Sequence, residues 1–161
     1  MFSIADFKSS SITIIHGPNT QEILFKLLIE SIINFDKDAL FIDCHNSIDP
    51  YKLARITKSY RKDPKDILSR IHVSRAFTEY QMESITYSLQ DAINRWNIGL
   101  LTISYMTSLF EDKRLFEILI NHIKLLTKSF DIVTIITSFG NEEFDKSLTK
   151  NADRIIDIRN H

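Results

Sequence analysis

Short, strongly apolar runs alternate with longer amphipathic segments, and this alternation constrains the fold of the chain more than any other feature. Six short runs of four to seven residues are apolar and β-rich, and most of them are nearly continuous in apolar side chains. Strands that are buried on both faces of a parallel sheet have this composition. Strands with one solvent-exposed face instead alternate apolar and polar residues. The predicted strands are Ser11–His16, Ala39–Asp43, Ile71–Ser74, Leu100–Ser104, Asp131–Thr137 and Arg154–Ile158. The pattern predicts an α/β protein of three layers, in which a mostly parallel, twisted sheet of about six strands has helices on both faces.

Helix-start signals lie between the predicted strands. Asp49-Pro50 and Asp63-Pro64 each place an N-capping side chain before a proline at the first helical position. Thr78 followed by Gln81 has the spacing of a capping box, in which each side chain bonds the other residue's backbone N–H. The carboxylates in residues 141–143 predict one more first turn, because negative charge is favourable at a helix N-terminus. Each signal predicts a helix that packs on the sheet.

Length and composition indicate one domain over residues 1–161. The 161 residues are 43% hydrophobic, which is enough for a sizeable core, and no linker or repeat divides them. A formal net charge of −1 gives no overall attraction to nucleic acid or to an acidic membrane. The single cysteine, Cys44, cannot form an internal disulfide, and the first ten residues do not resemble a signal peptide. We expect a cytoplasmic protein that does not contact a membrane.

The first predicted strand leads into a helix through Gly17, Pro18, Asn19 and Thr20, where a nucleotide-binding α/β protein carries its phosphate loop. A working loop reads GxxxxGK[ST], because backbone N–H groups wrap the phosphates and the lysine neutralises their charge. The turn here is about four residues too short for that motif, and Asn19 stands in place of the lysine. Two interpretations are open: an ordinary turn with an Asn or Thr cap, or residual anion binding at the helix N-terminus.

Three segments of the chain resemble the ATPase core of the RadA/RecA recombinase family. The stretch from IDCHNSIDPYKL to RAFTEYQM is similar to that family's second strand, helix pair and third strand, where members read close to IDTEGTFDPYRL and RAFTSYQQ. LLTISYMTSLF resembles the Walker B strand, and TQEILFKLL resembles the helix after the phosphate loop. The resemblance implies a RecA-like core, and in particular a minimal RadA paralogue that lacks the N-terminal helical domain and any C-terminal extension.

The positions that would carry ATP hydrolysis in the family are altered in this chain. Asn19 stands at the phosphate-binding lysine, Ser104 at the Walker B aspartate that organises Mg²⁺, and His45 at the glutamate that activates water. Thr20 alone keeps its family identity. The resemblance therefore implies a pseudo-ATPase without cofactor, metal or bound nucleotide. It would assist homologous recombination or DNA repair by binding a recombinase, an active RadA-type paralogue or another repair protein, in a homo- or hetero-oligomer.

Basic residues repeat at mostly three- to four-residue spacing along the predicted helix that begins at Pro50. They are Lys52, Arg55, Lys58, Arg61 and Lys62. A stripe of this kind suits a phosphate backbone, because each neutralised phosphate adds salt-dependent affinity. The alternative interpretation is a solvated helix face opposite an apolar one. Weak DNA binding through this stripe is thus one hypothesis for function.

Two smaller constellations permit further hypotheses. Phe2 and Ala5 match an FxxA pattern through which RadA-family protomers dock on a neighbour, although an ordinary hydrophobic start of the domain explains them as well. Asp43, His45 and Ser104 should lie close together at the carboxyl ends of strands, where open α/β sheets place ligands. They suggest a cryptic hydrolase, but no G-x-S-x-G elbow surrounds Ser104, and leftover active-site geometry accounts for the same residues.

Overall fold

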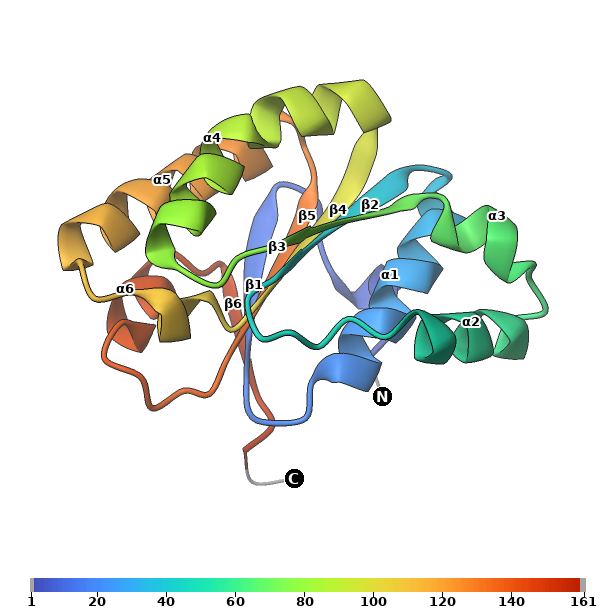
Figure 1. The fold of residues 1–161 in the computed structure, drawn as a ribbon, viewed down its shortest axis with the longest axis horizontal. Coiled ribbons are helices and arrows are strands. Elements are labelled where there is room, and N and C mark those ends of the chain that lie inside the picture. The colour runs from blue at the N-terminus through green and yellow to red at the C-terminus, as the bar shows by residue number, and fades with distance from the viewer. Residues whose placement is uncertain (1, 160–161) are drawn as a thin grey trace.

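Six strands form one sheet between two layers of helices in a computed structural model that describes residues 2–159 (Figure 1). The strands are β1 (Ser11–His16), β2 (Asp38–Asp43), β3 (Ile71–Arg75), β4 (Ile98–Ser104), β5 (Val133–Ser138) and β6 (Arg154–Asp157). The helices are α1 (Gln21–Phe35), α2 (Pro50–Ser59), α3 (Pro64–Leu68), α4 (Glu79–Trp96), α5 (Lys113–Ser129) and α6 (Asp145–Lys150), with 3₁₀ turns η1 (Ile4–Asp6) and η2 (Met106–Leu109).

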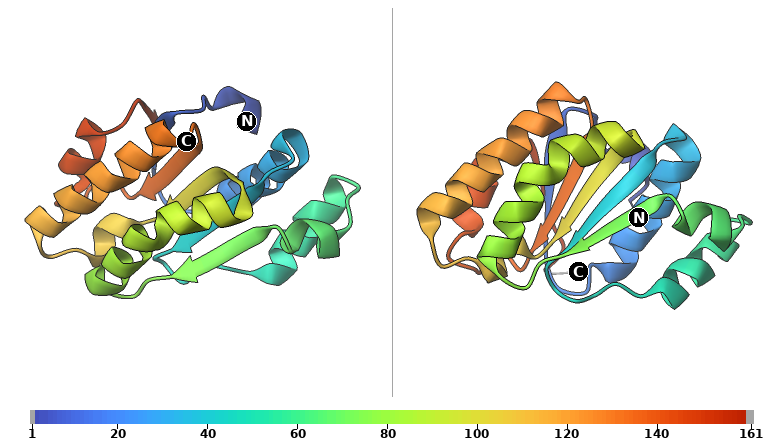
Figure 2. Two further views of the ribbon diagram at one scale, coloured as in Figure 1. Left: turned by 90° about the horizontal axis from the view of Figure 1, so that it is seen from above. Right: turned by 45° about the horizontal axis from the view of Figure 1, so that its top comes forward.

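All neighbouring strands are parallel, in the order β3-β2-β4-β5-β1-β6. Each connection therefore crosses one face of the sheet. Helices α1, α2 and α3 cover one face together with η1, and α4, α5 and α6 cover the other (Figure 2). This arrangement confirms the predicted α/β class and its three layers. It also puts the carboxyl ends of all six strands at one edge of the sheet, the usual place for ligands in open α/β folds.

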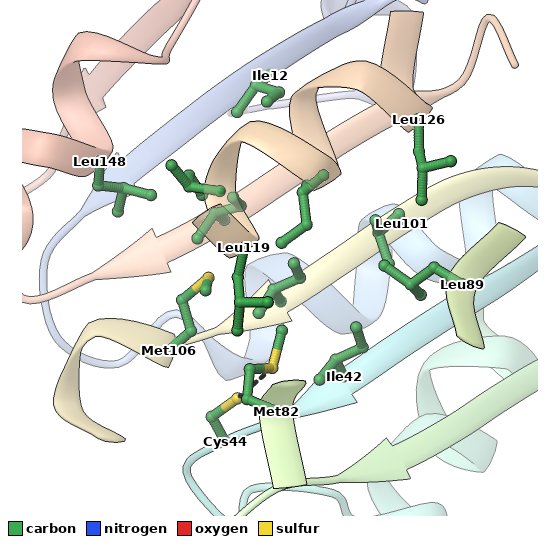
Figure 3. Close-up of a cluster of buried hydrophobic side chains, with 14 of the residues drawn as sticks. Ile12, Ile42, Cys44, Met82, Leu89, Leu101, Met106, Leu119, Leu126 and Leu148 are labelled. Carbon is green, nitrogen blue, oxygen red and sulfur yellow. Dashed lines mark hydrogen bonds between the residues drawn. The ribbon is translucent and has the colours of Figure 1, made fainter. Parts of the chain in front are cut away.

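Two hydrophobic clusters, one on each face of the sheet, form the core. Side chains alternate along a strand, so Leu40 and Ile42 of β2 enter the cluster under α4 and α5, while Phe41 enters the cluster under α1. Figure 3 shows the first cluster, with Leu101 of β4 and Leu119 of α5 among its members. Because the inner strands are buried on both faces, their sequences are apolar at nearly every position.

The strand predictions agree with the structure to within two residues at each end. Two aspartate caps are also confirmed: Asp49 accepts backbone N–H bonds at the start of α2, and Asp63 does so at the start of α3. The capping box at α4 forms in part. Thr78 accepts the N–H of Gln81, but the Gln81 side chain accepts the N–H of Phe77 at 2.7 Å instead of that of Thr78.

The helix start predicted at residues 141–143 is wrong. Helix α6 begins at Asp145, and the predicted first turn is a loop whose Glu142 N–H donates to the Asp145 carboxylate at 2.6 Å. Phe144 explains the shift, since its ring is buried against Phe116 with centroids 5.2 Å apart. Hydrophobic packing of one aromatic ring thus decides where the helix starts, and the preceding carboxylates do not. No helix among residues 2–159 is both long and apolar enough to cross a bilayer.

Candidate functional site

Asn19, His45 and Ser104, which the resemblance aligns with a nucleotide site, lie together at the carboxyl edge of the sheet. The loop after β1, the loop after β2 and the end of β4 surround a hollow of about 190 Å³, which we call the sheet-edge hollow. Its lining includes Asn19, Thr20, Gln21, His45, Ser104 and Tyr105. The structure therefore brings together the residues that the sequence grouped from distant segments. The hollow is smaller than the roughly 300 to 1,000 Å³ of most ligand pockets.

Tyr105 occupies the side of this hollow against the loop after β1. It directly follows β4, has a left-handed backbone (φ 54°), and is only 4% exposed. Its hydroxyl donates to the carbonyl of Gly17 at 2.8 Å and lies 2.8 Å from the hydroxyl of Thr20. Since a phenol has one hydrogen and the Gly17 carbonyl takes it, the Thr20 hydroxyl must donate to the Tyr105 oxygen. The Thr20 hydroxyl is therefore engaged by the tyrosine.

Two more rings pack on Tyr105 and form with it an aromatic cluster of His45, Tyr105 and Phe139. The rings of Tyr105 and Phe139 stack at 4.2 Å with an interplanar angle of 20°. His45 lies 4.8 Å from Tyr105 and 5.6 Å from Phe139. Contacts of this kind stabilise beyond the area they bury. The cluster joins the ends of β2, β4 and β5, so three crossover loops hold one another in place.

The loop after β1 has the short turn expected from its sequence, but the expected side-chain cap is absent. Gly17 has φ 146°, and an added Cβ would come within 2.5 Å of the Ile158 side chain, so glycine is required there. Asn19 is left-handed (φ 59°). Thr20 occupies the N-cap position of α1 without a cap hydrogen bond, because its hydroxyl is committed to Tyr105. The turn is fixed by tertiary contacts and by one glycine.

Asp43 organises the loop after β2. It is fully buried. Its Oδ2 accepts the N–H groups of Ser47 and Ile48, both at 2.8 Å, and its Oδ1 accepts the N–H of His45 at 3.1 Å and the hydroxyl of Ser104 at 3.2 Å. A buried carboxylate needs this many donors to offset its lost hydration. Asp43 is therefore a structural acceptor with its oxygens occupied, which leaves no face open for a substrate or an ion.

Two opposing effects set the pKa of Asp43. Burial alone would raise the pKa, because it disfavours the charged form, but the backbone N–H groups and the Ser104 hydroxyl stabilise the carboxylate more strongly. The pKa consequently lies below its ordinary value. The neighbouring Cys44 thiol responds in the opposite direction: burial, with the Asp43 charge beside it, raises its pKa to about 12. Cys44 is a core side chain and not a nucleophile.

Asp43, His45 and Ser104 do not form a nucleophilic triad. The Ser104 hydroxyl donates to Asp43 and accepts the N–H of Cys44 at 3.2 Å. In the part of the chain that the structure covers, no hydrogen bond joins the His45 ring to Ser104, and that ring packs on Tyr105 and Phe139 instead. A serine nucleophile needs a base within hydrogen-bond reach. The geometry gives the hydrolase hypothesis no such base.

The basic stripe lies on α2 and the turn that follows it. Lys52 donates to the Gln21 side chain at 2.9 Å, so it is tied to the first turn of α1. The other four, Arg55, Lys58, Arg61 and Lys62, are exposed and form no ion pair with any residue between 2 and 159. The stripe therefore divides into one lysine that is bonded to the Gln21 side chain and four cations that face solvent.

The FxxA residues lie at the start of the domain. Phe2 packs on one core cluster and meets Phe7 edge to face at 6.4 Å, while Ala5 is exposed. Between them Ile4 is fully buried, and its N–H donates to Glu30 at 2.9 Å. Docking of Phe2 on another molecule would require it to leave this contact.

No protein-family model matches the chain. The resemblance to RadA/RecA cores therefore rests on the motifs themselves. Within residues 2–159 no group of three or more His, Cys, Asp or Glu side chains is arranged to hold a metal ion. The residues that sequence reasoning missed are Tyr105 and Phe139. One signal for the first was available, since a large aromatic residue directly follows Ser104 in the sequence ISYM.

Proposed function

We propose that this chain is a non-catalytic RecA-like scaffold that assists homologous recombination or DNA repair by binding a recombinase, an active RadA-type paralogue or another repair protein. The observation that carries the proposal is the engagement of Gly17 and Thr20 by the Tyr105 hydroxyl. In a working phosphate loop the corresponding threonine and backbone must face the nucleotide and its metal. Here the same groups face a tyrosine of the chain itself.

Electrostatics supports the same proposal. A triphosphate carries several negative charges and is held by lysine, metal and converging N–H groups. No lysine or arginine lines the sheet-edge hollow, among the residues that the structure places there. Asp43, which pairs with Ser104 of the neighbouring strand β4, has its carboxylate oxygens occupied by N–H groups of the loop after β2. The site thus offers little to neutralise a nucleotide, while the folded shape around it is kept.

Two measurements test the proposal. Phosphate release from Mg-ATP should stay at the buffer background, and saturating Mg-ATP should leave the melting temperature unchanged, because a ligand that binds the folded state raises it. ATP turnover above background, or a rise of the melting temperature with Mg-ATP, would contradict the proposal.

The partner is tested separately. Affinity purification of the tagged chain from its native cells should recover a recombinase, a RadA-type ATPase or another repair protein. Mass spectrometry identifies the proteins that co-purify. Tyr105→Phe, which keeps the ring and loses the hydrogen bonds to Gly17 and Thr20, serves as the matched variant for the surface near the hollow. Recovery of only unrelated proteins would count against the biological part of the proposal, whatever the ATPase assay shows.

A further inference from the structure

The corner of the molecule formed by α2 and α3 concentrates positive charge. Residues 51–70 contain seven of the chain's 20 lysines and arginines but only two of its 21 aspartates and glutamates. The chain as a whole carries a net charge of −1, so the remainder is distinctly acidic. Such a segregated patch creates a local field that a net charge near zero conceals.

The cations of this corner are largely free of intramolecular partners. Arg70 is neutralised, because it pairs with Asp36 at 2.9 Å and Asp38 at 2.8 Å. Asp63, which directly follows Lys62 in the chain, accepts the backbone N–H of Lys65 as the cap of α3. The exposed cations of α2 and its following turn, by contrast, have no ion pair within the described chain.

An exposed aromatic ring lies on the same helix face as these cations. Tyr51, Arg55 and Lys58 are separated by four and three residues, and this spacing puts them on one side of α2, within about 11 Å along its axis. Tyr51 is 87% exposed, more than any other large hydrophobic residue that the structure leaves on the surface. The opposite side of the helix is apolar, and its Leu53 and Ile56 are buried in the core. We name the outer surface, with Lys62 in the turn after it, the Tyr51 face.

We propose that the Tyr51 face binds single-stranded nucleic acid. Lysine and arginine without partners attract phosphates by releasing condensed counterions. An exposed tyrosine offers a flat ring on which a base of a single strand can stack, whereas the bases of a duplex are stacked already. A membrane is the weaker fit, since an interfacial helix inserts its apolar side and the apolar side of α2 is turned into the core.

This inference does not depend on the scaffold proposal. The Tyr51 face is built from α2 and the turn after it, while the scaffold argument is built on Tyr105 and its partners at the sheet edge. A chain that fails to bind a recombination protein can still bind a single strand, and the reverse also holds. The scaffold proposal and the single-strand proposal can therefore be tested by independent measurements on the same preparation.

The test is fluorescence anisotropy with a labelled oligo-dT strand and with the same strand in a duplex, over a series of salt concentrations. The triple variant R55A/K58A/K62A should bind the single strand at least about ten-fold more weakly, and its dependence of log affinity on log salt should be shallower by about 2. The matched control is K113A/R114A/K146A, which removes the same charge from exposed positions on α5 and α6. It should keep both the affinity and the slope.

Tyr51 tests the stacking contribution. Tyr51→Ala should weaken single-strand binding by about five-fold or more, and Tyr51→Phe should restore it, since both rings stack. The proposal is overturned if the single strand does not bind at low salt or if the duplex binds as tightly as the single strand. It is also overturned if K113A/R114A/K146A loses as much affinity as R55A/K58A/K62A. Equal competition by polyglutamate, or binding of anionic phospholipid vesicles in place of oligo-dT, would likewise overturn it.

Discussion

The sheet-edge hollow and the Tyr51 face differ in whether their polar groups have partners within the chain. At the hollow, the hydroxyl of Tyr105 and the carboxylate of Asp43 each have partners within the chain. On the Tyr51 face, Arg55 and Lys58 project into solvent without ion pairs among the described residues. The place where an α/β fold usually holds a ligand is a small hollow in which Tyr105 bonds Gly17 and Thr20, whereas the cations of the helix surface face solvent.

This contrast has an energetic meaning. Groups that are buried and mutually hydrogen-bonded stabilise the fold, and removing one leaves its partners unsatisfied. Exposed charges contribute little to folding and remain available to a partner. Substitutions in the two regions should therefore differ in kind: those at the hollow change stability, and those on the Tyr51 face change binding.

The largest effect is expected for Tyr105→Ala. The substitution removes a buried ring from the aromatic cluster and breaks the hydrogen bonds to Gly17 and Thr20, which should lower the free energy of unfolding by about 4 kcal/mol. Tyr105→Phe keeps the ring and loses only the hydroxyl, at a cost of about 1 kcal/mol. Urea denaturation followed by circular dichroism measures both. Equal losses in the two variants would show that the ring packing contributes nothing.

The second largest effect is expected for Asp43→Ala, which should lower the free energy of unfolding by about 3 kcal/mol, because it leaves buried N–H groups after β2 without an acceptor. Asp43→Asn has nearly the same size and keeps one carbonyl oxygen, so it should lose less. The same denaturation experiment separates them. A loss below about 1 kcal/mol for Asp43→Ala would mean that water replaces the carboxylate and that the loop is not held as described.

Acid should weaken the fold through Asp43. Its pKa is below the ordinary value of 3.8 in the folded state, so its contribution is fully present above pH 3.8 and is lost as the pH falls through the lower folded pKa. Stability measured from pH 6 downward should therefore fall less steeply in Asp43→Asn than in the native chain. Identical slopes would show that other carboxylates, such as Asp153, account for the whole acid response.

The smallest effect on stability is expected for R55A/K58A/K62A. These side chains are exposed and have no ion pair among residues 2–159, so the free energy of unfolding should change by no more than about 0.5 kcal/mol. Thermal melting alongside the control triple measures this. A large destabilisation would erase the distinction between the two regions, because the stripe would then be part of the fold.

Local signals in the sequence determined the elements of this protein. Apolar runs located the four inner strands because these are buried on two faces, and shorter runs located the edge strands β3 and β6. Asp49 and Asp63 marked the starts of α2 and α3, because helix capping acts over a few neighbouring residues. The convergence of Asn19, His45 and Ser104 also followed, since the carboxyl ends of parallel strands lie at one edge of the sheet.

Tertiary structure alone decided what those positions do. Tyr105 lies 85 residues from the threonine it engages and 88 from Gly17, and no local rule relates such distant side chains. The start of α6 was likewise decided by the burial of Phe144, against the signal of the acidic residues before it. Local propensities are worth fractions of a kcal/mol per residue, whereas burying one aromatic ring is worth a few, so packing overrides propensity wherever the two disagree.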